Sequence, residues 1–203
     1  MDFVYEVNNF IPPKMSKLII DLFEKDENKE YGTVAKPTGE VVVDKTKKDS
    51  VELCISDKKD WEDINNYIST KLCKEVNGYK KYLYDLFIAK NIEKDDIYNM
   101  LSFEPLCAKG NVVQRITLNT EYRWHCDTCF IPERRVMSCI VCIMYLNNVD
   151  DEYGGKTEFI NGRIIKPEAG KLIMFPATWD YFHKGQLVKT DKYILTNAFY
   201  KIV

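Results

Sequence analysis

The second half of the chain is a succession of short segments rich in β-branched and aromatic residues, separated by Gly, Asn, Asp and Pro. No helical pattern intervenes between these segments, and short strands at such close spacing are typical of an antiparallel sandwich or a jelly-roll barrel. The sequence therefore predicts a rolled antiparallel sheet. The predicted strands cover residues 111–118, 122–127, 135–146, 156–160, 162–167, 171–177, 180–188 and 192–203.

The first half is mainly helical in pattern. One helix is predicted after Pro12 and Pro13, and a second over about 60–91, where Trp61, Ile64, Ile68, Leu72 and Val76 recur at three- or four-residue steps. The Asn-Gly pair at 77–78 is expected to end or kink this helix. The segment 32–50 reads as a loop or hairpin at the surface. Helices first and strands second favour an α+β fold in which helices support one sheet.

The length of 203 residues suits one domain. We expect residues 1–203 to form it, with about 1–100 as mainly helical support and about 101–203 as the β core. The net charge of -2 gives no electrostatic reason to expect a membrane or general nucleic-acid partner. No signal peptide or apolar span is evident, and the 7 cysteines are scattered, so we expect free thiols and a cytoplasmic location.

Both histidines of the chain, His125 and His183, fall in predicted strands. Asp127 follows the first at a spacing that puts both side chains on one face of a strand, together with Arg123. A His-x-Asp pair alone is more often hydrogen-bonded than metal-binding. Two imidazoles and one carboxylate together, however, can bind one face of a metal ion and leave its other positions open, as in non-heme Fe(II) oxygenases.

Lys192 begins the last predicted strand, and it shares a face with Ile194, Thr196 and Ala198 on a two-residue period. A lysine on an otherwise apolar, inward face is costly unless an anion meets it, and a dicarboxylate cosubstrate would supply that anion. The Thr196 hydroxyl could bind the same carboxylate. The alternative is a lysine at the solvent-exposed rim of the sheet.

An ordered set of short motifs resembles the iron(II)- and 2-oxoglutarate-dependent dioxygenases, specifically their prolyl 4-hydroxylase-like branch. The set covers roughly residues 110–200, and only the full set is specific. The motifs are Tyr-x-x-His-x-Asp at 122–127, Tyr-Leu-Asn at 145–147, Gly-Gly-x-Thr-x-Phe at 154–159, Pro-x-x-Gly-x-x-x-x-Phe at 167–175, and a histidine, a glycine and a basic residue at 183, 185 and 192.

The resemblance implies a double-stranded β-helix (jelly-roll) core with N-terminal supporting helices. It also implies that His125, Asp127 and His183 bind iron, and that Lys192 anchors 2-oxoglutarate.

Two further positions carry weaker implications for the cosubstrate. Tyr145 and Thr196 match family positions close to 2-oxoglutarate. One departure is Ile116, because many family members have a tyrosine nine residues before the first iron-binding histidine. Either Tyr145 replaces that missing hydroxyl or the 2-oxoglutarate pocket differs from that of the family.

The implied activity is that of a procollagen-proline-dioxygenase-like oxidoreductase, which hydroxylates a C–H bond and converts 2-oxoglutarate to succinate and CO2. Its implied cofactors are Fe(2+), 2-oxoglutarate and O2, with ascorbate as an additional candidate. The implied partner is a peptide or protein substrate containing proline; free proline or another small molecule is the alternative. Tyr122, Arg123, Trp124, Trp179 and the segment 128–135 are candidates for the rim of the site.

A different class of function rests on Cys126, Cys129, Cys139 and Cys142, whose paired Cys-x-x-Cys spacing resembles a zinc ribbon. Residues three apart in a strand face opposite ways, and Cys139 and Cys142 lie within a continuous strand pattern, which argues against that binding module. A degenerate oxygenase fold used only for binding and a zinc hydrolase on the same ligands are further alternatives. The hydrolase alternative gives Lys192 no role.

Overall fold

A computed structural model describes residues 1–36, 40–102, 106–107 and 110–202 of the chain. Its helices are α1 (Pro13–Lys25), α2 (Glu62–Ile88) and α3 (Lys94–Leu101). The first-half strands are β1 (Tyr5–Val7), β2 (Glu30–Tyr31), β3 (Val34–Ala35), β4 (Val41–Val42) and β5 (Ser50–Cys54). The second-half strands are β6 (Leu106–Cys107), β7 (Val112–Ile116), β8 (Thr120–His125), β9 (Phe130–Ile131), β10 (Val136–Tyr145), β11 (Thr157–Phe159), β12 (Ile164–Ile165), β13 (Leu172–Pro176), β14 (His183–Val188) and β15 (Lys192–Ile202).

Two antiparallel sheets form the core of the fold. The large sheet has the order β1-β13-β10-β15-β7-β5-β2, with β6 beside β15 and β9 beside β10. The small sheet has the order β12-β11-β14-β8, and β3 and β4 pair with each other. Non-consecutive strands thus lie side by side in both sheets, as a rolled sheet requires. The predicted α+β fold with a double-stranded β-helix core and supporting helices is confirmed.

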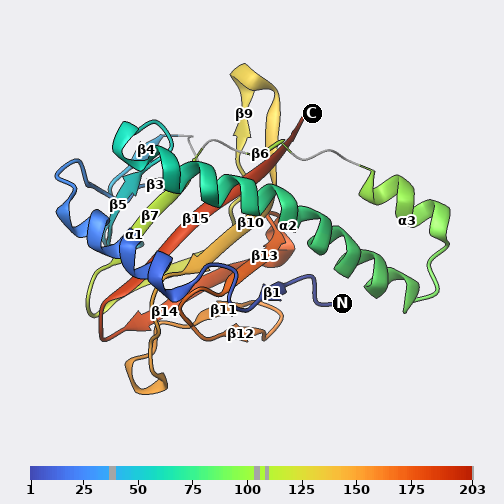
Figure 1. The fold of residues 1–203 in the computed structure, drawn as a ribbon. Helices are drawn as coiled ribbons and strands as arrows, with labels where there is room; N and C mark the ends of the chain where they lie inside the picture. The colour runs from blue at the N-terminus through green and yellow to red at the C-terminus, as the bar shows by residue number, and fades with distance from the viewer. Residues whose placement is uncertain (37–39, 103–105, 108–109, 203) are drawn as a thin grey trace.

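The two longer helices cover one face of the large sheet (Figure 1). α2 buries a stripe at three- and four-residue steps, formed by Ile64, Ile68, Leu72, Val76, Tyr79, Leu83 and Phe87. α1 starts at Pro13, where a missing backbone N–H costs nothing, and buries Ile19 and Phe23. These side chains pack on residues such as Leu195 and Phe199 of β15.

The other face of the large sheet is turned toward the small sheet. Val141, Ile143 and Tyr145 of β10 pack there with Phe159 of β11 and Phe175 of β13. β15 follows the same two-residue alternation, because Leu195 packs toward the helices while Ile194 and Thr196 line a cavity on the opposite side. This alternation decides which side chains of β15 reach that cavity.

Each of the eight segments predicted as strands contains a strand, and α1 and α2 lie where helices are predicted. The helix does not end at Asn77-Gly78, since α2 runs through this pair. Burial of Val76 and Tyr79 on the sheet outweighs the cost of about 1 kcal/mol for a glycine inside a helix. The first half is less purely helical than predicted, because β1, β2 and β5 join the large sheet.

None of the helices within the described residues combines the length and the apolar character that crossing a lipid bilayer demands.

Candidate active site

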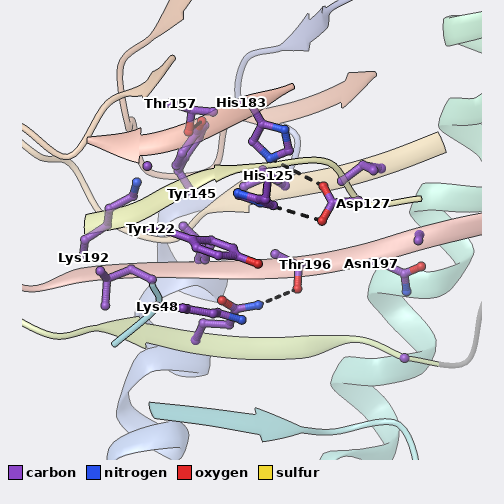
Figure 2. Close-up of a pocket in the computed structure, with 18 of the residues that line it drawn as sticks. Lys48, Tyr122, His125, Asp127, Tyr145, Thr157, His183, Lys192, Thr196 and Asn197 are labelled. Carbon is purple, nitrogen blue, oxygen red and sulfur yellow. Dashed lines mark hydrogen bonds and ion pairs between the residues drawn. The ribbon is translucent and has the colours of Figure 1, made fainter. Parts of the chain in front are cut away.

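A cavity of about 330 Å³ lies between the large and small sheets. His125, Asp127 and His183 line it, as do Lys192, Tyr145 and Thr196. All six residues predicted from the sequence for the metal and cosubstrate sites therefore meet in one cavity (Figure 2).

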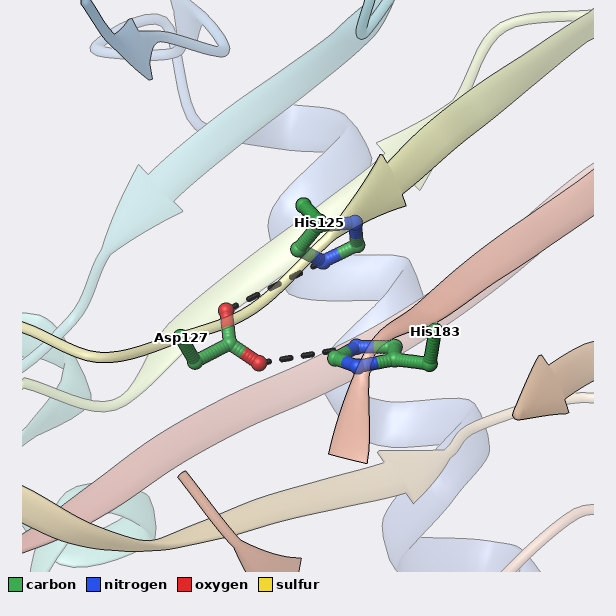
Figure 3. Close-up of side chains that lie close together, drawn as sticks. All are labelled: His125, Asp127 and His183. Atoms are coloured by element: carbon green, nitrogen blue, oxygen red, sulfur yellow. Dashed lines mark ion pairs between the residues drawn. The ribbon is translucent and has the colours of Figure 1, made fainter. Parts of the chain in front are cut away.

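The two histidines come together through strand pairing. His125 ends β8, His183 begins β14, and the two are register partners across these antiparallel strands. Their ring centroids lie 4.2 Å apart. Asp127 follows the end of β8 instead of lying within the strand, so its carboxylate reaches both rings: Oδ1 is 3.8 Å from Nε2 of His125, and Oδ2 is 3.5 Å from Nε2 of His183 (Figure 3).

Backbone carbonyls fix the orientation of both imidazoles. Nδ1 of His125 lies 2.8 Å from the carbonyl oxygen of Arg123, and Nδ1 of His183 lies 3.0 Å from that of Tyr181. Because a carbonyl oxygen can only accept, Nδ1 carries the proton in each ring and Nε2 keeps a free lone pair. Hydrogen bonds of this kind orient histidine ligands in metal sites.

The electrostatics at His125 favour a neutral imidazole. The pKa of His125 is lowered to about 4, first by burial and then by the neighbouring His183, while Asp127 opposes the shift. The donor atoms of His125, Asp127 and His183 all lie within 4.8 Å of one another. Two neutral imidazole nitrogens and a carboxylate oxygen are a donor set that fits Fe(II).

Lys192 is a buried cation in the same cavity, with 5% of its surface exposed. Its Nζ donates to the carbonyl oxygen of Gly155, 2.5 Å away, and burial lowers its pKa to about 8. Gly155 has φ +69°, and a Cβ there would approach the Lys192 side chain and clash with Val188. No carboxylate of the described residues pairs with Lys192, so the ammonium is suited to bind an anion.

Two hydrogen-bonded pairs flank Lys192 and the histidines. Tyr145 is fully buried, and its hydroxyl donates to Oγ1 of Thr157 over 2.7 Å. Thr196 Oγ1 accepts from Nε2 of Gln114 over 2.9 Å. Ile116, the position that departs from the family pattern, also lines the cavity and is the register partner of Lys192.

Of the side chains proposed for the rim, Tyr122 lines the cavity and stacks on His125, with ring centroids 3.6 Å apart. Trp124 instead stacks on Phe182, and neither it nor Trp179 lines the cavity. Arg123 is exposed and contributes its backbone carbonyl, so the expectation that its side chain shares the face of His125 is wrong. Within the segment 128–135, Cys129 lines the cavity and β9 pairs with β10.

Several residues that line the cavity were not identified from the sequence, among them Lys48, Gln114 and Thr157. Lys48 and Gln114 carried no motif signal. Thr157 lies inside the Gly-Gly-x-Thr-x-Phe motif, which could have identified it.

The cysteines whose side chains the structure describes form no comparable cluster. In the part of the chain that the structure describes, His125, Asp127 and His183 are the one group of His, Cys, Asp and Glu side chains close enough to hold a metal ion. Cys142 is buried and Cys129 is exposed. The zinc-ribbon alternative therefore gains no support from the geometry.

Comparison with solved structures gives the same fold over nearly the whole chain. A viral collagen prolyl hydroxylase from Paramecium bursaria Chlorella virus-1, in complex with 2-oxoglutarate, superimposes with a TM-score of 0.65 at 15% identity, covering 99% of this chain and 97% of that chain. A Pseudomonas putida prolyl-4-hydroxylase gives 0.62 at 15% identity, covering 97% and 91%. A Trichoplax adhaerens prolyl hydroxylase in complex with a hypoxia inducible factor peptide fragment gives 0.69 at 16% identity, covering 99% and 84%.

A search of curated proteins gives no significant match. Residues 112–200, which run from β7 almost to the end of β15, match the family described as the 2OG-Fe(II) oxygenase superfamily. The matched residues include the histidines and the aspartate of the cavity, and over this part the chain is similar to the 2OG-Fe(II) oxygenase superfamily.

Proposed function

We propose that the protein hydroxylates a prolyl residue of a peptide, with His125, Asp127 and His183 as iron ligands and Lys192 as the anchor of 2-oxoglutarate. The observation that carries this proposal is the meeting, in one cavity, of a His-Asp-His donor set and a buried lysine with no carboxylate partner among the described residues. When bound, iron and 2-oxoglutarate supply the oxidising chemistry that inserts one atom of O2 into a C–H bond and releases succinate and CO2.

Different residues of the chain would bind and orient the iron ion and 2-oxoglutarate. The carbonyl oxygens of Arg123 and Tyr181 keep the proton on Nδ1, so both Nε2 atoms are available as ligands. Asp127 brings one negative charge against the charge of the cation. Tyr145 and Ile116 bury the surroundings of Lys192, and a drier site strengthens the attraction between its ammonium and a carboxylate.

A prolyl peptide is the favoured substrate because the similar solved structures are prolyl hydroxylases, and one of them holds a peptide fragment. Tyr122 offers a flat aromatic surface directly beside His125, on which a ring-shaped, apolar residue such as proline can pack.

The test is anaerobic reconstitution with Fe(II), 2-oxoglutarate and ascorbate, followed by O2 and a panel of proline-rich peptides, read by mass spectrometry. Matched peptides with alanine in place of proline, and free proline, serve as controls. We expect a gain of one oxygen atom on proline, coupled to succinate. Oxygen gained only by free proline would replace the peptide substrate with a small molecule, and no succinate at all would overturn the activity.

A further inference from the structure

A second buried lysine lies in the wall of the cavity. Lys48 is 8% exposed and lines the cavity, although it precedes β5 and lies far in sequence from the other lining residues. Its backbone is fixed on two sides, because its N–H donates to the carbonyl oxygen of Asp44 and an isolated bridge pairs it with Tyr122 of β8. The side chain therefore enters the cavity from a defined position.

The ammonium of Lys48 forms an ion pair that does not occupy all of its N–H donors. Its Nζ lies 2.5 Å from Oε1 of Glu52, which also accepts from the hydroxyl of Ser50. Glu52 is the one carboxylate paired with it among the described residues, and an ammonium has three N–H donors. Lys48 can therefore donate to an oxygen atom in the cavity without giving up its carboxylate.

Lys48 and Lys192 lie on different walls of the cavity (Figure 2). Strand register places Glu52 of β5 opposite Gln114 of β7, and Gln114 opposite Ile194 of β15. β7 thus lies between β5, which follows Lys48, and β15, which begins at Lys192. Since one lysine suffices for the free carboxylate of 2-oxoglutarate, Lys48 is left for another ligand.

The position of Lys48 points to the substrate as that ligand. Its Nζ lies 5.1 Å from the ring centroid of Tyr122, and the Tyr122 ring stacks on His125. A molecule packed on Tyr122 beside the histidines would therefore reach the Lys48 ammonium. Glu52 already neutralises that ammonium, so a neutral carbonyl oxygen fits better than a second carboxylate, which would add an unbalanced charge.

We propose that Lys48 donates a hydrogen bond to a backbone carbonyl oxygen of the peptide substrate and thereby positions the target carbon beside His125 and His183. This inference rests on the proposed function, because it takes a peptide as the substrate. Lys48 would then affect kcat/KM for the peptide, whereas Lys192 would affect the KM for 2-oxoglutarate.

The test compares Lys48→Met combined with Glu52→Gln, which leaves no unpaired carboxylate, with Lys48→Arg, which keeps the charge. Lys171→Met is the control, since Lys171 is 7% exposed and ion-paired with Glu6 and Glu168 but does not line the cavity. Loss of a hydrogen bond from a charged donor is expected to lower kcat/KM for peptide by roughly 10- to 100-fold. The KM for 2-oxoglutarate should stay unchanged, and Lys48→Arg should recover most of the activity.

Anaerobic calorimetry of the same proline-rich peptide with the iron-loaded protein gives a second readout that needs no turnover. We expect weaker peptide binding in the Lys48 double variant and unchanged binding in Lys171→Met. A raised KM for 2-oxoglutarate, a loss confined to peptides with Asp or Glu near proline, or an equal loss in Lys171→Met would each overturn the role of Lys48. If the wild-type protein forms no succinate or oxidises no peptide, the proposed function fails. If it oxidises the peptide and the Lys48 double variant binds and oxidises that peptide equally well, the inference about Lys48 alone fails.

Discussion

His125 and His183 are register partners on adjacent antiparallel strands, and their ring centroids lie 4.2 Å apart. The pairing of β8 with β14 thus brings together two side chains that lie far apart in sequence. Because both rings are held through Nδ1, their Nε2 atoms turn toward the Asp127 carboxylate, which completes the donor set.

Replacing Lys192 with methionine is expected to raise the 2-oxoglutarate concentration needed for half-maximal succinate formation by roughly 10- to 100-fold, since a charge-assisted contact with a carboxylate is lost. Lys192→Arg should retain part of the affinity. Lys184→Met is the control, because Lys184 is paired with Glu158 and does not line the cavity. A Lys192→Met variant that kept the cosubstrate affinity of the wild type would refute the anchor role.

The affinity for 2-oxoglutarate should fall as the pH rises above about 8, the pKa to which burial lowers Lys192. Above this pH, Lys192 in the free protein has lost its proton, and with it the positive charge that attracts the cosubstrate carboxylate. The unfolded lysine keeps its proton up to about its ordinary value of 10.5, so between these pH values the unfolded state binds more protons and the Lys192 contribution to folding stability rises with pH.

The check is the KM for 2-oxoglutarate measured across this pH range in the wild type and in Lys192→Arg. The guanidinium stays protonated throughout, so the rise in KM should be weaker in the variant. Identical pH profiles in the two proteins would show that another group titrates.

Tyr145→Phe removes the hydrogen bond from the buried Tyr145 hydroxyl to Thr157. We expect the free energy of unfolding in denaturant to fall by about 1 kcal/mol and the KM for 2-oxoglutarate to rise. Tyr5→Phe is the control, because it removes a hydrogen bond to Glu75 outside the cavity and should leave this KM unchanged. A Tyr145→Phe variant with the wild-type KM would limit Tyr145 to a role in stability.

Cys126→Ser and Cys139→Ser separate the oxygenase from a zinc ribbon. Neither cysteine belongs to the described group of side chains that could hold a metal ion, so each variant should retain one iron per chain and bind no zinc. Elemental analysis after reconstitution measures both metals. Zinc that is present in the wild type and lost in both variants would favour the ribbon.

The strands and the two longer helices were predictable because hydrophobic periodicity is local. The site residues could be placed from the sequence only where they belong to a motif, as do His125, Asp127, His183 and Lys192. β5 and α3 were missed. β5 is short and mixes Ser and Glu with apolar residues, and α3 buries only Ile97 among the residues described for it.

Contacts between distant segments explain the rest of what the sequence did not reveal. Lys48 reaches the cavity because β5 pairs with β7 and the turn before it pairs with β8. Gln114 meets Thr196 through the pairing of β7 with β15. Neither contact follows from local spacing, since each depends on strand order in the folded sheet.

The most direct test of the account is iron binding and succinate formation by the wild type and His183→Ala, measured side by side after anaerobic reconstitution with Fe(II) and 2-oxoglutarate. The account predicts one iron per chain and succinate formation for the wild type. It predicts loss of both in His183→Ala, and retention of both in Tyr5→Phe. A His183→Ala protein that is folded, keeps its iron and still forms succinate would contradict the assignment of the metal site.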